Sequence, residues 1–186
     1  MTVEEIFGKI AARLVKGMMA HDQFASYYQF LGFDGCKCCH EYHFLKETLS
    51  YRKVQKYYIR KYNKLVSEEK IEDPSIIPDS WWKHTRQDVD NSTKRSAVKT
   101  ALELWHKWEV ETHKVYCEMY KELEELGEYG SADFVRCLIC DVEEEIKDIE
   151  KKQLTLGDVD YSLSYLAQRQ SCLHDKYHDK KKKLLD

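Results

Sequence analysis

Apolar residues recur at spacings of three and four along most of the chain, which is the pattern of amphipathic α-helices. Only seven glycines and two prolines interrupt the 186 residues, so we expect long helices and disfavour a β-rich fold. The pattern predicts five helices, at about Val3–Leu31, His40–Val66, Ser92–Leu126, Ser131–Leu156 and from Asp158 to the C-terminus.

Both prolines fall within residues 67–91, the longest stretch without helical periodicity, which we expect to be a connector. A helix pair, a long connector and a second helix pair predict an all-α fold. We expect a four-helix bundle with a long central connector, an arrangement that resembles ferritin-like bundles, plus a C-terminal fifth helix. Residues 1–186 are expected to form a single helical domain with a frayed basic tail at 180–186.

Polar residues interrupt the apolar stripes of several of the predicted helices. His21 lies on the stripe of the first helix and Glu109 on that of the third, while Glu47 borders the stripe of the second. A buried carboxylate is costly unless it is paired, protonated or bound to a metal. Inward carboxylates and histidines from four helices are how bundles build di-iron sites, so we consider a site formed by His21, Glu47, Glu109 and Glu144, with Glu145 as the alternative fourth ligand.

The ligand set departs from the di-iron pattern, however. No histidine follows Glu47 or Glu144 by three residues, and the only Glu-x-x-His pair, Glu103 with His106, lies off the stripe. The pair His40 and His43 is not assigned to the site. The alternative is a polar layer that fixes the register of the helices without a metal.

Cysteines form two groups that could hold one zinc ion. The candidate ligands are Cys36, Cys38 and Cys39 before the second helix, with Cys137 and Cys140 in the fourth. Alternatively, these thiols are buried as small apolar groups. The odd number of cysteines and the acidic, amphipathic start of the chain predict reduced thiols and a cytoplasmic protein with no membrane span.

The formal net charge of −3 hides a strong separation of charge. Between Lys37 and Lys64 eight basic residues accompany two acidic ones, whereas between Leu102 and Glu150 fifteen acidic residues accompany five basic ones. Oppositely charged helices can simply pack side by side. The acidic helices could also dock on a basic protein channel, and the basic, tyrosine-rich second helix could hold a phosphate backbone. The candidate partner-binding residues are Glu118, Glu122 and Glu125, with Arg52, Lys56, Arg60 and Tyr57 on the basic side.

Three short motifs carry a resemblance to a known class of proteins. These are HEYH at 40–43, TRQDVD at 85–90 and WEVET at 108–112. The stretch from His21 to Leu156 resembles small helical proteins carried by phages and mobile elements of Firmicutes, a class that includes type II-A anti-CRISPR proteins. The resemblance implies a protein that binds Cas9 in the cytoplasm of a host bacterium and blocks its engagement of DNA.

Two functions are therefore compared. The first is an inhibitor that binds a host nucleic-acid enzyme such as Cas9 and needs no cofactor. The second is a ferritin-like di-iron carboxylate protein that handles iron or oxidants. The chain has no Gly-x-Ser-x-Gly motif, Gly-rich phosphate loop or His-Glu-x-x-His motif, so the sequence favours the binding protein over an enzyme.

Overall fold

The computed structural model describes residues 1–67 and 76–185, and it confirms the all-α bundle with a C-terminal fifth helix. Part of the predicted connector, 68–75, lies outside the described residues, as does Asp186. The described elements are α1 (Val3–Leu31), α2 (Asp34–Tyr62), the 3-10 helix η1 (Asp79–Lys83), α3 (Asn91–Glu125), α4 (Tyr129–Gly157) and α5 (Leu163–Leu185). In this part of the chain, none of the helices is both long and apolar enough to cross a membrane.

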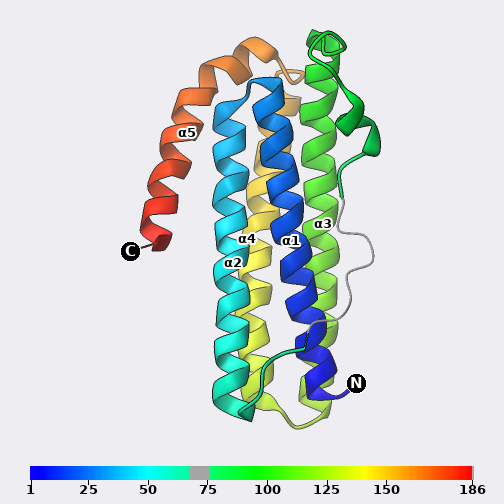
Figure 1. The fold of residues 1–186 in the computed structure, drawn as a ribbon, viewed down its shortest axis with the longest axis vertical. Helices are drawn as coiled ribbons and strands as arrows, with labels where there is room; N and C mark the ends of the chain where they lie inside the picture. The colour runs from blue at the N-terminus through cyan, green and yellow to red at the C-terminus, as the bar shows by residue number, and fades with distance from the viewer. Residues whose placement is uncertain (68–75, 186) are drawn as a thin grey trace.

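The four long helices form two antiparallel hairpins, α1 with α2 and α3 with α4 (Figure 1). Helix α2 ends at the bottom of the bundle in this view, while α3 begins at the top, so α2 and α3 run in the same direction. The end of α2 and the start of α3 therefore lie at opposite ends of the bundle. In the described part of that connector, Trp81 of η1 stacks on Tyr27 of α1, with ring centroids 4.2 Å apart.

Helix α2 begins six residues earlier than the sequence predicts. Gly32 caps α1 in the left-handed conformation, with φ of 80°, and only Gly32 and Phe33 separate the two helices. Gly35, predicted to break the chain, lies inside α2 and is buried. A Cβ atom at this position would lie 2.4 Å from the carbonyl oxygen of Gln170 in α5, so the glycine permits close packing of the two helices.

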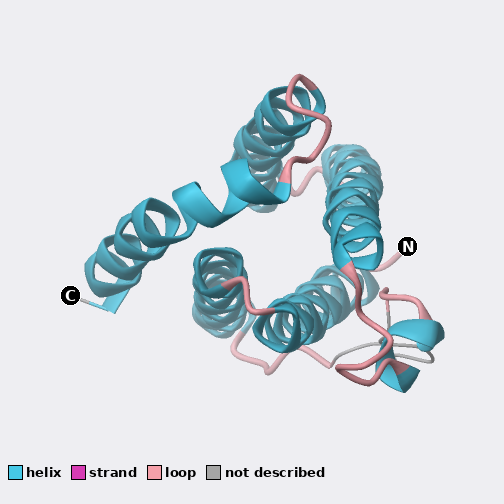
Figure 2. Cartoon of the chain, turned by 90° about the horizontal axis from the view of Figure 1, so that it is seen from above, coloured by secondary structure: helices cyan, strands magenta, loops and turns pink. Residues whose placement is uncertain are grey.

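Helix α5 turns back at the end of α4 and packs along α2 (Figures 1 and 2). The N-cap residue of α2, Phe33, has no side chain that can accept a hydrogen bond. Gln170 of α5 replaces it, because its Oε1 accepts from the backbone N–H groups of Gly35, at 2.7 Å, and Cys36, at 3.3 Å.

The basic end of α5 is also attached to α2. The Nζ of Lys181 lies 2.6 Å from a carboxylate oxygen of Glu41, and α5 continues to Leu185. A frayed tail was predicted at 180–186. In the structure, residues 180–185 belong to α5, and this contact continues the packing of α5 on α2.

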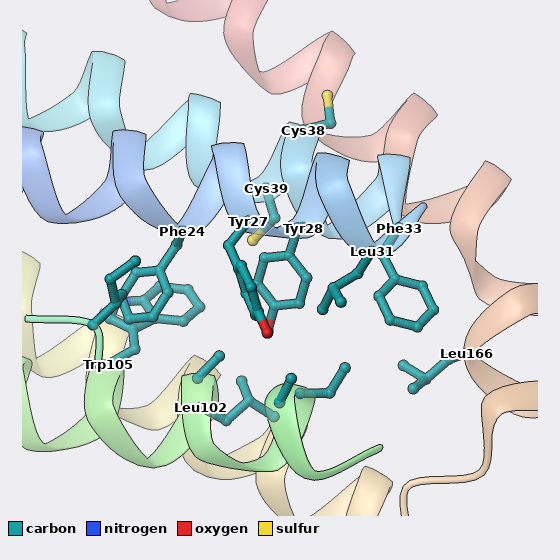
Figure 3. Packing of buried hydrophobic residues seen from close by; sticks show 14 of the residues in the cluster. Phe24, Tyr27, Tyr28, Leu31, Phe33, Cys38, Cys39, Leu102, Trp105 and Leu166 are labelled. Atoms are coloured by element: carbon teal, nitrogen blue, oxygen red, sulfur yellow. The ribbon is translucent and has the colours of Figure 1, made fainter. Parts of the chain in front are cut away.

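Buried apolar residues form two separate clusters along the bundle. One lies near the end where α1 meets α2, around Phe24, Tyr28 and Trp105 (Figure 3). The other surrounds Phe7 and Leu123 towards the opposite end. Each of the four long helices passes from one cluster to the other, and buried polar residues lie between them.

We predict that replacing Gly35 with alanine weakens the attachment of α5. The new Cβ would overlap the backbone of α5, so we expect the free energy of unfolding to fall by about 2 kcal/mol. Chemical denaturation measures this change, and limited proteolysis reports whether α5 is cut first. The matched control is Gly157→Ala, whose Cβ would meet no atom within 4 Å. Equal stability of both variants would contradict close packing at Gly35.

Candidate metal centre

Between the two apolar clusters, each long helix contributes ionisable side chains to one layer. Helix α1 provides His21, α2 provides His43 and Glu47, α3 provides Glu109 and α4 provides Glu145. Four of these residues are buried, and Glu47 is partly buried. The layer therefore brings together side chains that are up to 124 positions apart in sequence numbering.

These residues form two overlapping groups of ligand atoms. In His21, His43 and Glu145, one ligand atom of each residue lies within 4.8 Å of the others. The same holds for His21, Glu47, Glu109 and Glu145. Because the groups share His21 and Glu145, the layer is one cluster of two imidazoles and three carboxylates.

Several of the ligand atoms are buried without a hydrogen-bond partner among the described residues. They are Nε2 of His21, both ring nitrogens of His43, and one carboxylate oxygen each of Glu109 and Glu145. Buried polar atoms are normally satisfied by hydrogen bonds, so their convergence indicates a group that the protein alone does not supply. This is the observation that separates a candidate metal centre from an ordinary polar layer.

The remaining atoms of the cluster have partners that fix their orientation. Trp105 Nε1 donates to Glu109 Oε1 at 3.0 Å, and the Nδ1 atoms of His21 and His40 lie 3.0 Å apart. Lys46 Nζ donates to Glu145 Oε1 at 2.5 Å. The other Glu145 oxygen forms an ion pair with His43 Nδ1 at 3.2 Å, so these two atoms face each other within the cluster.

Gly17 makes room for Glu47. It lies one helical turn before His21 on α1, and a Cβ at this position would lie 3.2 Å from the carboxyl carbon of Glu47. That distance is tighter than an ordinary carbon contact, so any larger residue would displace the carboxylate. The small residue on α1 thus lets a side chain from α2 reach the centre of the bundle.

Burial and mutual repulsion shift the pKa values of the three carboxyl groups in different directions. Burial, with the charge of Glu145, raises the pKa of Glu47 to about 8, and the same causes raise the pKa of Glu109 well above its usual value. Burial would also raise the pKa of Glu145, but His43 and Lys46 hold it below its usual value. One carboxylate is thus compensated by cations, while the other two lack an equivalent partner.

Burial also keeps two of the imidazoles neutral. It lowers the pKa of His21 to about 3, helped by the charge of His43, and lowers the pKa of His40 well below its usual value. Burial alone would lower the pKa of His43, but the charge of Glu145 and the side-chain contacts with Cys39 and Glu145 together raise it. A neutral imidazole is the form that binds a metal ion, so His21 is held in the ligating form.

The structure brings together three of the four predicted metal ligands, His21, Glu47 and Glu109. It corrects the fourth, because Glu144 is exposed and the adjacent Glu145 points into the cluster. The sequence analysis also missed His43, which belongs to the cluster. Its signal was present, since His43 and Glu47 are four residues apart and so share one face of a helix.

The two cysteine groups are not brought together. Cys36, Cys38 and Cys39 lie at the start of α2, whereas Cys137 and Cys140 are exposed near the start of α4 at the other end of the bundle (Figure 1). From the helical rise per residue, the groups are on the order of 25 Å apart along the bundle. They therefore cannot share one zinc ion in this structure.

Most of the predicted partner-binding residues are exposed, and two of them make contacts within the bundle. Glu118, Glu125, Arg52, Lys56 and Arg60 are all exposed. Two others already hold the bundle together: Glu122 pairs with the amino group of Met1 at 3.0 Å, and the ring of Tyr57 stacks on Phe134 with centroids 4.3 Å apart.

The donor set fits a divalent transition metal. Imidazole and carboxylate groups together suit iron, zinc or manganese, and three carboxylates supply the negative charge that such an ion requires. Compared with the di-iron pattern of four carboxylates and two histidines, the cluster lacks one carboxylate and contains Lys46 beside Glu145.

We predict that Gly17→Ala lowers the affinity of the cluster for a divalent ion by about tenfold, because the methyl group displaces the Glu47 carboxylate. Alanine also favours the helix, so the fold should be retained. Titration with Mn²⁺ measures the affinity. Gly130→Ala is the control, because its Cβ would make only ordinary contacts, and unchanged affinity in Gly17→Ala would remove Glu47 from the site.

Comparison with known proteins supplies no relative on which to base a function. No protein-family model, curated protein or solved structure matches the chain. The resemblance to phage-encoded inhibitors thus stays a prediction, and the functional argument depends on the geometry of the buried cluster.

Proposed function

We propose that the chain is a metal-binding helical bundle of the di-iron carboxylate type, which handles iron or oxidants. The observation that carries this proposal is the convergence of unpartnered, buried imidazole and carboxylate atoms from four helices. The ligands are His21, His43, Glu47, Glu109 and Glu145. When bound, iron would supply redox chemistry, while the protein fixes the ligands and excludes bulk water.

The topology of the bundle supports the same proposal. Two antiparallel helix pairs joined by a connector that spans the bundle are the arrangement of ferritin-like proteins, which place their metal ligands on the four inner helix faces. In this chain, Trp105 donates a hydrogen bond to Glu109 and Lys46 donates one to Glu145. Metal ligands are commonly oriented by such hydrogen bonds from residues that do not bind the metal.

We predict that protein purified after growth with added iron contains about two iron ions per chain, as a bundle site of this type implies. Glu109→Gln should lose bound iron and keep the fold, because glutamine has the same shape and its oxygen can still accept from Trp105. Elemental analysis measures the metal, and circular dichroism checks the fold.

The matched control is Glu144→Gln, which removes an exposed carboxylate next to Glu145 and should keep the iron content of the parent protein. Removal of iron by a chelator should lower the unfolding temperature of the parent protein and of this control, but not that of Glu109→Gln. A folded parent protein that neither contains nor takes up iron would overturn the proposal.

A second candidate function is the inhibition of Cas9 that the sequence resemblance implies. Exposed charges on two helices support it. Helix α3 carries the acidic residues Glu118 and Glu125, and α2 carries the basic residues Arg52, Lys56 and Arg60. None of these five side chains forms an ion pair within the described residues. They are therefore free to contact a partner.

We predict for this function that the protein binds a Firmicutes Cas9–guide complex in a pull-down at moderate salt and prevents it from binding DNA. Reversing Glu118 and Glu125 to lysine should weaken the complex and reduce its salt dependence, because these charges steer association. Glu109→Gln should leave the interaction intact. A series of Firmicutes Cas9 complexes that all fail to bind would count against it.

A further inference from the structure

Helix α5 closes a cavity of about 290 Å³ on the side of the bundle where α2 and α4 lie apart. Its walls come from the four long helices and α5, and its size is near the lower end of known small-molecule pockets. Neither the metal centre nor the predicted partner surfaces account for it.

The inner wall of the cavity is apolar and aromatic. Tyr28, Leu102, Trp105 and Leu166 line it, and each is at most 5% exposed. Figure 3 shows these side chains along the space between α1 and α3, with Leu166 of α5 at one side. Such a wall favours an alkyl or aromatic group over a polar one.

The outer part of the cavity is basic. Lys151, Arg169 and Lys176 line it and are exposed, and none of them pairs with a carboxylate among the described residues. Lys152 adds a fourth cation, but it is already paired with Asp148 at 2.9 Å. Three unpaired cations therefore surround the entrance to an apolar interior.

From this arrangement we infer that the cavity binds a small apolar carboxylic acid. Its carboxylate lies at the entrance with Lys151, Arg169 and Lys176, and its apolar part packs on Leu102, Trp105 and Leu166. Charge selects against a cationic ligand, and the apolar wall selects against a polyanion such as a nucleotide, which would leave polar groups buried without partners. The inference goes beyond the metal centre and does not require it.

Isothermal titration calorimetry with octanoate tests the inference on the protein as purified. Octan-1-ol and octylamine serve as neutral and cationic probes of the same chain length. We expect octanoate to bind about tenfold more tightly than either, because only its head group is attracted to the entrance. Equal affinity for octanoate and octan-1-ol, or no octanoate binding, would overturn the inference.

Two variants locate the bound octanoate. The double variant Lys151→Glu with Arg169→Glu should weaken octanoate binding about tenfold. Its control, Arg52→Glu with Lys53→Glu, makes the same change in net charge on an exposed surface of α2 outside the cavity and should leave the affinity within about twofold. An equal loss in both double variants would show nonspecific attraction and overturn the inference.

Filling the cavity provides a second, charge-independent test. Leu166→Trp adds volume to the wall formed by α5 and should abolish octanoate binding in a protein that still folds by circular dichroism. Leu166→Met is the volume-conserving control and should retain binding. Repeating the titration with Glu109→Gln separates the two proposals, because octanoate should bind whether or not the protein holds a metal.

Discussion

The burial of carboxyl groups in one layer is the constraint on which the rest of the structure depends. Glu109 and Glu145 are almost inaccessible to solvent, at 1% and 7% exposure, and apolar clusters close the layer on both sides. Burying such groups costs several kcal/mol for each charge that is not compensated. Lys46 and His43 compensate Glu145, whereas the ring that faces Glu109 among the described residues, that of His21, is kept neutral by burial. Burial accordingly raises the pKa of Glu109 and favours its protonated form, whereas a bound cation would stabilise the carboxylate, which is why we interpret the layer as a candidate site.

Local sequence choices place this layer in the middle of the bundle. Gly17 leaves space for Glu47, and Trp105 contributes its ring to the apolar cluster and its N–H group to Glu109. Arg13 stacks on Trp108, with the guanidinium carbon 3.4 Å from the ring centroid, and donates to Thr112 Oγ1 at 2.8 Å. These contacts hold α1 against α3 beside the layer. The two hairpins are thus joined through polar contacts in their middle and apolar contacts towards their ends.

Helical periodicity was sufficient to predict the all-α bundle, but it did not identify every residue that points into the bundle. On α4 the buried residues recur at spacings of three and four positions: Val135, Leu138, Val142, Glu145 and Ile149. Glu144 was nevertheless predicted as the fourth ligand, with Glu145 only as the alternative, although this spacing passes through Glu145 and not Glu144. On α2 the inward positions are mostly polar: His40, His43, Glu47, Ser50 and Val54. Hydrophobicity cannot identify a face whose buried residues are ligands, whereas the spacing alone could have done so. The path of α5 had no such signal, because it depends on Gln170 and Gly35, which meet only in three dimensions.

His40 connects the two sites that the structure contains. Its Nδ1 lies 3.0 Å from Nδ1 of His21, and its ring lies 4.8 Å from that of Trp105 and lines the cavity. The two Nδ1 atoms can share only one proton, so the tautomer of His40 is tied to that of His21. Because Nδ1 of His21 faces His40, Nε2 is the nitrogen left for a metal ion, and it has a free lone pair only when Nδ1 carries the proton. A ligand that fills the cavity packs against the same imidazole and restricts its orientation. The proposed cavity ligand and the proposed metal ion would therefore lie on either side of one imidazole, that of His40.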